Sequence, residues 1–263
     1  MKKRFLSILL SIILCCCLFP AIALAAETET PTTYSVYVGG EQFASDKLTL
    51  AGNTGTATYD PTTGTITLNN YSYTGTGDYY NRAGIYSSGI ETLNIVLVGE
   101  NTISNTSYYE DALNNGQGYG IRTIGNLNIA GDGSLAITAK TTGIEVTESL
   151  KTGSDLHITV KTNCGIDAAS VEMTGGETEI YADADGGNYG ILPYGIYVYE
   201  DFILSGGALS VSAAYGYGIE AYSADISDST LHITACYDAL YAADTLSVEN
   251  AVCRKRCLYT GIL

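Results

Sequence analysis

The sequence predicts an all-β protein built as a parallel β-helix, a solenoid of about seven rungs of roughly 22 residues, with an N-terminal β-hairpin cap. Three observations predict this fold. A glycine-led unit recurs along the chain, apolar residues alternate with polar ones inside each unit, and turn residues separate segments that are too short for ordinary helices.

The repeated unit opens with glycine and isoleucine and continues with two short apolar segments. Its openings are separated by 36, 23, 22, 30, 23 and 21 residues, and they lie at Gly84, Gly120, Gly143, Gly165, Gly195, Gly218 and, in degraded form, Ala239. The two long intervals carry insertions at residues 104–117 and 183–194. Isoleucine follows the glycine in six units and Leu240 follows Ala239 in the last, which predicts a stacked apolar column.

Within the units the apolar residues have a period of two. Leu127 and Ile129 form one such pair, and Leu231 and Ile233 form another. This spacing is typical of strands with one buried face. Short alternating strands also occur in β-sandwiches, which are the competing interpretation. The isoleucine column favours the β-helix, because stacking explains it directly.

The segment from Tyr34 to Gly77 is strand-like but does not follow the repeat. Residues 56–59 and 65–68 flank a run of turn residues from Asp60 to Gly64, so we expect a hairpin that caps the first rung. The predicted organisation is a signal peptide at 1–25, a β cap at 26–80, a parallel β-helix at 81–250 and an irregular tail at 251–263.

The N-terminal residues predict export. Lys2, Lys3 and Arg4 precede an apolar run of about 15 residues that ends before Pro20, and Ala23 to Ala25 supply a small-x-small cleavage pattern. The run is shorter than the roughly 20 residues of a membrane-spanning helix. Lipidation at Cys15–Cys17 is the alternative, although a small residue before the cysteine is lacking. We therefore expect an extracellular or cell-surface location, with no membrane association after signal removal.

The charge of the mature chain limits its partners. Removal of the signal peptide takes away three of the 12 Lys and Arg residues. The mature chain then has 9 basic and 28 acidic residues, a net charge of −19. Such a surface repels nucleic acids and anionic membranes. Export would permit disulfides among Cys164, Cys236, Cys253 and Cys257, but their pairing and the oligomeric state stay open.

Four segments resemble a known family. They are residues 38–40, 58–60, 65–70 and 96–103, and together they resemble an extracellular family of clostridia-like bacteria. Its members are described as carbohydrate-binding-domain-containing or surface proteins with a pectin-lyase-like, right-handed β-helix. The resemblance covers residues 34–250, and Gly99–Ile103 is its most specific part. It implies a right-handed β-helix in a surface protein, and it says little about an activity.

The tail departs from the repeat with the basic run at residues 253–257. An alternative expectation is therefore a structural spacer, or a truncated or frameshifted remnant of a larger adhesin-like protein.

Enzymes of the pectin-lyase-like fold need calcium ligands beside a base, or clustered carboxylates. Arg122 and the acids at equivalent positions, Glu145, Asp167 and Glu220, are the candidates for a polysaccharide lyase or hydrolase. A salt-bridged face is the simpler interpretation, so we predict no catalytic residue and a protein that is not an enzyme.

No metal site or cofactor is predicted either. The acidic loop at residues 183–188 lacks the later bidentate glutamate of an EF-hand. His157 and His232 each lie between two inward apolar residues, at exposed strand positions too far apart to share a metal.

The tyrosines are the candidate binding residues. The chain has 22 Tyr, 4 Phe and no Trp, and many tyrosines flank the repeat opening. Tyrosine offers an apolar face and a hydroxyl, which suit a sugar ring. We predict a non-catalytic module that contacts a glycan of a cell wall or host surface through Tyr119, Tyr194, Tyr197, Tyr217 and Tyr222, with Tyr194 beside Tyr217 and Tyr197 near Tyr222. An aromatic ladder that merely covers the strands is the alternative.

Overall fold

The computed structural model describes residues 30–77, 82–107, 109–111, 114–160, 164–182 and 193–257, with the backbone alone for 109–111, 114–117 and 257. The chain divides into Met1–Pro31 and Thr32–Leu263, and the described strands all lie in the second unit. The described residues are all-β, with 74% strand and no helix. The strands form a mixed, largely parallel sheet, which confirms the predicted fold class at this level. The predicted signal peptide lies outside the described residues.

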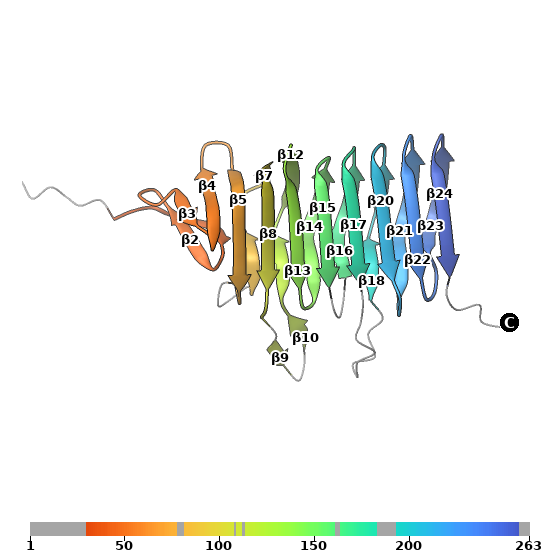
Figure 1. Cartoon of the computed structure of the whole chain (residues 1–263), viewed down its shortest axis with the longest axis horizontal. Coiled ribbons are helices and arrows are strands. Elements are labelled where there is room, and N and C mark those ends of the chain that lie inside the picture. Colours follow the sequence, from red (N-terminus) through yellow and green to blue (C-terminus); the bar gives the residue numbers. More distant parts are fainter. Residues whose placement is uncertain are drawn as a thin grey trace, which may run out of the picture. The chain divides into compact units, whose positions relative to one another are not determined.

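The described residues form 24 strands, of which 22 belong to one sheet while β9 and β10 pair only with each other (Figure 1). Their bounds are β1 Thr33–Val38, β2 Glu41–Ala44, β3 Thr49–Ala51, β4 Thr54–Asp60, β5 Thr65–Gly75, β6 Ala83–Ser87, β7 Thr92–Val98, β8 Glu100–Asn105, β9 Tyr109–Asp111, β10 Asn114–Gln117, β11 Tyr119–Thr123, β12 Asn126–Gly131, β13 Ser134–Ala139, β14 Thr142–Thr152, β15 Asp155–Val160, β16 Cys164–Met173, β17 Glu177–Ala182, β18 Tyr194–Val198, β19 Asp201–Leu204, β20 Ala208–Ala213, β21 Tyr217–Ser227, β22 Thr230–Ala235, β23 Leu240–Glu249 and β24 Val252–Cys257.

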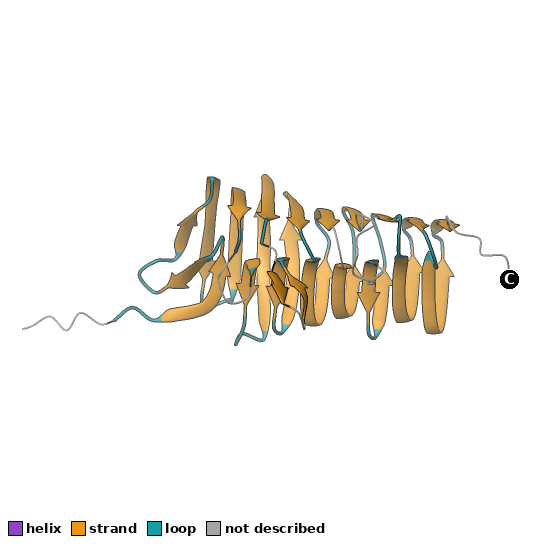
Figure 2. Ribbon diagram, turned by 90° about the horizontal axis from the view of Figure 1, so that it is seen from below, coloured by secondary structure: helices purple, strands orange, loops and turns teal. Residues whose placement is uncertain are grey.

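The parallel strands form three rows, in which each strand pairs with its equivalent in the repeats before and after it (Figures 1 and 2). The first row contains β6, β11, β18 and the beginnings of β14, β16, β21 and β23. The second contains β7, β12, β19, the beginning of β5 and the ends of β14, β16, β21 and β23. The third contains the end of β5 and then β8, β13, β15, β17, β20, β22 and β24.

The predicted isoleucine column is confirmed. Its members are register neighbours along the first row, and they are Ile85, Ile121, Ile144, Ile166, Ile196, Ile219 and Leu240. The six isoleucines are fully buried. They belong to one core cluster with the inward residues of the other two rows, so the core runs along the whole stack of repeats.

The glycine that opens each repeat has a steric cause. A Cβ atom on Gly120 or Gly143 would lie 2.5 Å from the carbonyl oxygen of the next opening glycine. It would lie closer still to the Cγ2 methyl of Ile137 or Ile158 in the third row. A Cβ atom does not fit here unless the neighbouring backbone or the facing isoleucine shifts, so glycine is favoured wherever another repeat follows, whereas Ala239 opens the last described repeat.

The Gly99–Ile103 motif has a structural role. The buried Asn101 amide donates to the carbonyl oxygens of Gly99 and Ser134, each at 3.2 Å, and its Oδ1 accepts from the Tyr71 amide at 2.9 Å. Asn105 at the end of β8 donates to the carbonyl oxygens of Arg82 and Tyr119, each at 2.6 Å. These amides add side-chain hydrogen bonds to backbone groups at the ends of the strands, where the carbonyl oxygens of Gly99 and Arg82 also accept from the backbone N–H groups of Ser134 and Tyr119.

The N-terminal segment contains the predicted hairpin. β4 and β5 are antiparallel, with Asp60 opposite Thr65. β1 also pairs antiparallel with β6, so two antiparallel strands lie at the start of the first and second rows. β5 in addition pairs in parallel with β7 and β8. Parallel pairing therefore begins at Thr65, inside the segment that the sequence assigned to the cap.

The prediction of an irregular tail at 251–263 is wrong for residues 252–257. These residues form β24, which pairs in parallel with β22 along its whole length. The edge of β22 offers backbone hydrogen-bonding groups regardless of side chains, and Cys253 packs against the core. The sequence did not predict this strand, because its basic composition is not typical of a β-strand. Residues 258–263 lie outside the described residues.

The first insertion, predicted as a loop, contains the antiparallel pair β9 and β10. Of the second insertion, predicted at 183–194, residues 183–192 with the acidic loop considered for calcium lie outside the described residues, and Tyr194 already begins β18. Across the part of the chain that the structure describes, no helix is long and apolar enough to cross a membrane.

Candidate ligand-binding face

The outward side chains of the first row form the candidate site. The residue after each isoleucine of the column points away from the core, and register pairs these residues in the order Tyr86, Arg122, Glu145, Asp167, Tyr197, Glu220 and Tyr241. The predicted common position of Arg122, Glu145, Asp167 and Glu220 is therefore confirmed. We call this set the outward row.

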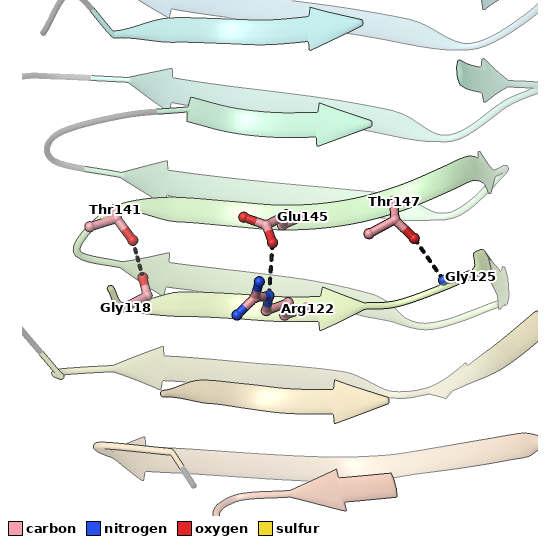
Figure 3. A network of polar contacts seen from close by, with 6 residues as sticks. All are labelled: Gly118, Arg122, Gly125, Thr141, Glu145 and Thr147. Atoms are coloured by element: carbon pink, nitrogen blue, oxygen red, sulfur yellow. Dashed lines mark hydrogen bonds and ion pairs between the residues drawn. The ribbon is translucent and has the colours of Figure 1, made fainter. Parts of the chain in front are cut away.

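Arg122 is held by its neighbours. Its Nε lies 2.8 Å from Oε1 of Glu145 in the next repeat (Figure 3), and its guanidinium carbon lies 4.8 Å from the ring centroid of Tyr119. Both partners in the ion pair are mostly buried, with 28% and 23% of their side chains exposed. The predicted salt-bridged face is confirmed here. Burial, and then the Glu145 carboxylate, raise the pKa of Tyr119.

Asp167 lies next to Glu145 in register and has an altered acidity. Burial, followed by the negative charge of Glu145, raises the pKa of Asp167 from its ordinary 3.8 to about 6. Two neighbouring carboxyl groups thus sit in different electrostatic settings, since Glu145 has a cation partner in Arg122.

A tyrosine ladder flanks the outward row. The rings of Tyr194 and Tyr217 are stacked with centroids 5.1 Å apart and an interplanar angle of 15°, which confirms their predicted proximity. Tyr217 also stacks on Tyr237 at 5.2 Å and 29°. Because these rings cover one another, their faces are largely unavailable to a ligand, and they act as a rigid support.

Tyr197 joins the ladder to the outward row. Its ring lies 5.0 Å from Tyr194 and makes an edge contact with Tyr199 at 4.9 Å. The prediction that Tyr197 lies near Tyr222 is wrong in register, because Tyr197 pairs with Glu220. Tyr197 is one residue after its isoleucine and Tyr222 is three after its own, so Tyr199 is the equivalent of Tyr222.

Three tyrosines on the strands of this region are well exposed, Tyr199 at 60%, Tyr222 at 54% and Tyr241 at 48%, and Tyr215, at 54%, lies in the turn before β21. We define the tyrosine face as Tyr194, Tyr197, Tyr199, Tyr217, Tyr222, Tyr237 and Tyr241. Tyr119 is a predicted site residue that lies apart from it, because Thr142 and Cys164 separate Tyr119 from Tyr194 in register. Tyr199, Tyr237 and Tyr241 are the members that the site predicted from the sequence lacked.

Carboxylates adjoin the tyrosine face. Burial, and then the nearby Glu220, raise the pKa of both Tyr194 and Tyr197. Burial, and then Asp238, raise the pKa of Glu220. The face therefore combines exposed aromatic rings with hydrogen-bond acceptors.

The remaining candidates lie in the third row. His157 and His232 are exposed strand residues, as predicted, and Nδ1 of His157 lies 3.0 Å from Oε2 of Glu179. A hollow of about 270 Å³ lies beside His157 and Glu179, with Asp155 and Glu177 also in its lining. Among the described residues, no three His, Cys, Asp or Glu side chains gather to hold a metal. Cys164, Cys236 and Cys253 are free thiols.

Comparison with known proteins finds no matching family model, no similar curated protein and no similar solved structure.

Proposed function

We propose that this protein is a secreted, non-catalytic surface module that binds carbohydrate on its tyrosine face. In the same proposal the three strand rows are the faces of a right-handed parallel β-helix of the pectin-lyase-like kind. Parallel pairing of equivalent strands in successive repeats and the single continuous core support this architecture. The resemblance of residues 34–250 to carbohydrate-binding surface proteins, and the N-terminal export pattern, point in the same direction.

The observation that carries the proposal is the placement of exposed tyrosines beside carboxylates. Tyr199, Tyr222 and Tyr241 are about half exposed or more, and Glu220 lies between Tyr197 and Tyr241 in the outward row. The apolar face of a sugar ring packs on an aromatic ring, and sugar hydroxyls donate to carboxylates. Both kinds of contact are available on one surface.

The ladder supplies rigidity for this contact. Tyr194 and Tyr217 are stacked and half-buried, so they hold Tyr197 in place. Side chains that are already ordered lose little conformational entropy when a ligand binds. We therefore assign direct contact to the exposed tyrosines and a supporting role to the stacked ones, which revises the site predicted from the sequence.

Glycan-array screening of the mature protein, followed by calorimetry on each hit, tests the proposal. Replacing Tyr222 by Ala should weaken binding by roughly twofold to twelvefold, because one aromatic contact contributes about 0.5–1.5 kcal/mol. Tyr181→Ala is the matched control, since Tyr181 is 41% exposed but lies in the third row. Absence of binding across plant, mucin and cell-wall glycans would refute the proposal.

One observation favours a second candidate function, the cleavage of an acidic polysaccharide. Burial and the neighbouring Glu145 raise the pKa of Asp167 to about 6, so Asp167 would be the proton donor beside the Glu145 side chain, as in carboxylate-pair hydrolases. New reducing ends released from polygalacturonate, and lost in Asp167→Asn with binding retained, would favour this function over simple binding. An Arg122→Ala variant should also lose the activity, because Arg122 pairs with Glu145.

Export is tested separately by mass spectrometry of the protein recovered from culture medium. Cleavage after Ala25 is the expected result, and an intact Met1 on a cell-retained protein would contradict it.

A further inference from the structure

The edge formed by β23 and β24 differs from the rest of the sheet. Among the described residues, β23 pairs only with β21 and β24 only with β22. The backbone N–H and C=O groups on the other side of both strands therefore have no strand partner in the described chain. Such an edge accepts a further strand unless something prevents it.

Apolar side chains of this edge are uncovered. Leu246 and Val248 stand in register with Ala224 and Ile226, which are buried at 3% and 0%. Leu246 and Val248 themselves are each 48% exposed. The inward rows of the core thus continue onto an open surface.

The charge of β24 sets the chemistry of this surface. Arg254, Lys255 and Arg256 are consecutive and exposed in a chain whose net charge is −16. Lys255 is in register with Ile233, so it occupies an inward position where the preceding repeats have isoleucine or valine. A further repeat of the same apolar kind would bury this ammonium group without a partner, which is costly.

We propose that the β24 edge binds an acidic, extended segment of a partner protein by strand addition. The backbone of the partner completes the hydrogen-bond ladder, and consecutive carboxylates pair with Arg254 and Arg256 on the outside and with Lys255 on the inside. Apolar residues next to the acids cover Leu246 and Val248. A second copy paired β24 to β24 would bring like charges together, and a flexible polyanion would leave the ladder and the apolar residues unused.

The test uses the full mature chain and the fluorescent peptide Thr-Val-Glu-Glu-Glu-Val-Thr in an anisotropy titration. The peptide should bind, while Thr-Val-Lys-Lys-Lys-Val-Thr should not. The same acidic peptide methylated at alternate backbone nitrogens keeps its charge but cannot complete a strand ladder. It should bind at least about tenfold more weakly. These measurements on the unaltered protein stand even if a variant does not fold.

A pair of charge reversals localises the site. Lys255→Glu should weaken binding by about tenfold or more, whereas Lys151→Glu, the same charge change at an exposed lysine of β14, should leave it within about twofold. Equal binding of the methylated peptide would overturn the proposal in favour of charge attraction alone. Equal competition by heparin would point to a polyanion. Self-association in light scattering that Lys255→Glu alters would point to a second copy as the occupant.

Discussion

Replacing Gly143 by alanine tests whether backbone proximity dictates the repeat. The new Cβ would lie 2.5 Å from the carbonyl oxygen of Gly165, whereas ordinary van der Waals contact begins at 3.4 Å. The shortfall is 0.9 Å against an atom that is fixed by parallel pairing with the next repeat. Overpacking of this size costs roughly 2–3 kcal/mol. The midpoint of thermal unfolding should fall by roughly 4–12 °C for a protein of this length.

Gly175→Ala is the matched control for this substitution. Its Cβ would meet only the Gly153 carbonyl oxygen, at an ordinary 3.7 Å, so stability should be unchanged or slightly higher. Adding Ile158→Leu to Gly143→Ala removes the facing methyl branch but leaves the carbonyl, so it should restore only part of the loss. Urea and thermal unfolding measure all three variants. Equal stability of Gly143→Ala and Gly175→Ala would refute the steric explanation.

Three further substitutions test buried polar groups. Asn101→Ala should lower the free energy of unfolding in urea by about 2–4 kcal/mol, because it leaves the Tyr71 amide without an acceptor. The control Asn128→Ala loses one side-chain hydrogen bond, to Asn94 on the outer surface, and should lower it by under about 1 kcal/mol. Equal losses would contradict the role of Asn101. Thr123→Val should stabilise the protein by about 1 kcal/mol, since its buried hydroxyl has no hydrogen-bond partner among the described residues, and a loss of stability would show that a partner exists. The raised pKa of Asp167 means that the folded protein binds this proton more tightly than the unfolded chain, so its contribution to stability falls as pH rises from 3.8 through about 6. Asp167→Asn should remove this fall in the urea midpoint, and identical pH profiles for the two proteins would contradict it.

The repeat was predictable because its physical cause is local. Alternation within a unit and a spacing near 22 residues were enough to place Ile121, Ile144 and Ile166 in one column, and residues at the same place in each unit pair in register. The stacking of Tyr194 on Tyr217 followed from the same count, since both directly precede the opening glycine.

Other features depend on contacts between rows, which counting within a unit does not reveal. Substitution of the opening glycine by a larger residue is opposed by an isoleucine of the third row. For Gly143 this is Ile158, which lies 15 residues further along the chain. Tyr237 reaches Tyr217 although it lies two residues before Ala239, because the turn before the last unit differs. The pairing of Tyr197 with Glu220, by contrast, could have been predicted from the sequence, since each directly follows the column isoleucine of its repeat.

The strand at β24 was missed for a different reason. The side chains of β24 are typical of a soluble basic segment, but its backbone pairs in parallel with β22. A composition rule cannot detect a strand whose pairing is stabilised by a preformed edge.

The Asn105 side-chain amide links the two ends of the first insertion, so the length of the insertion need not affect the pairing of the repeats on either side. It bonds the carbonyl of Tyr119, the residue at which the chain re-enters the first row, and so ties together both ends of the excursion. Closing a longer excursion costs little, about 0.6 kcal/mol for each doubling of its length. We therefore expect that foreign peptides of different lengths grafted between these anchor points will leave the register of the stack unchanged.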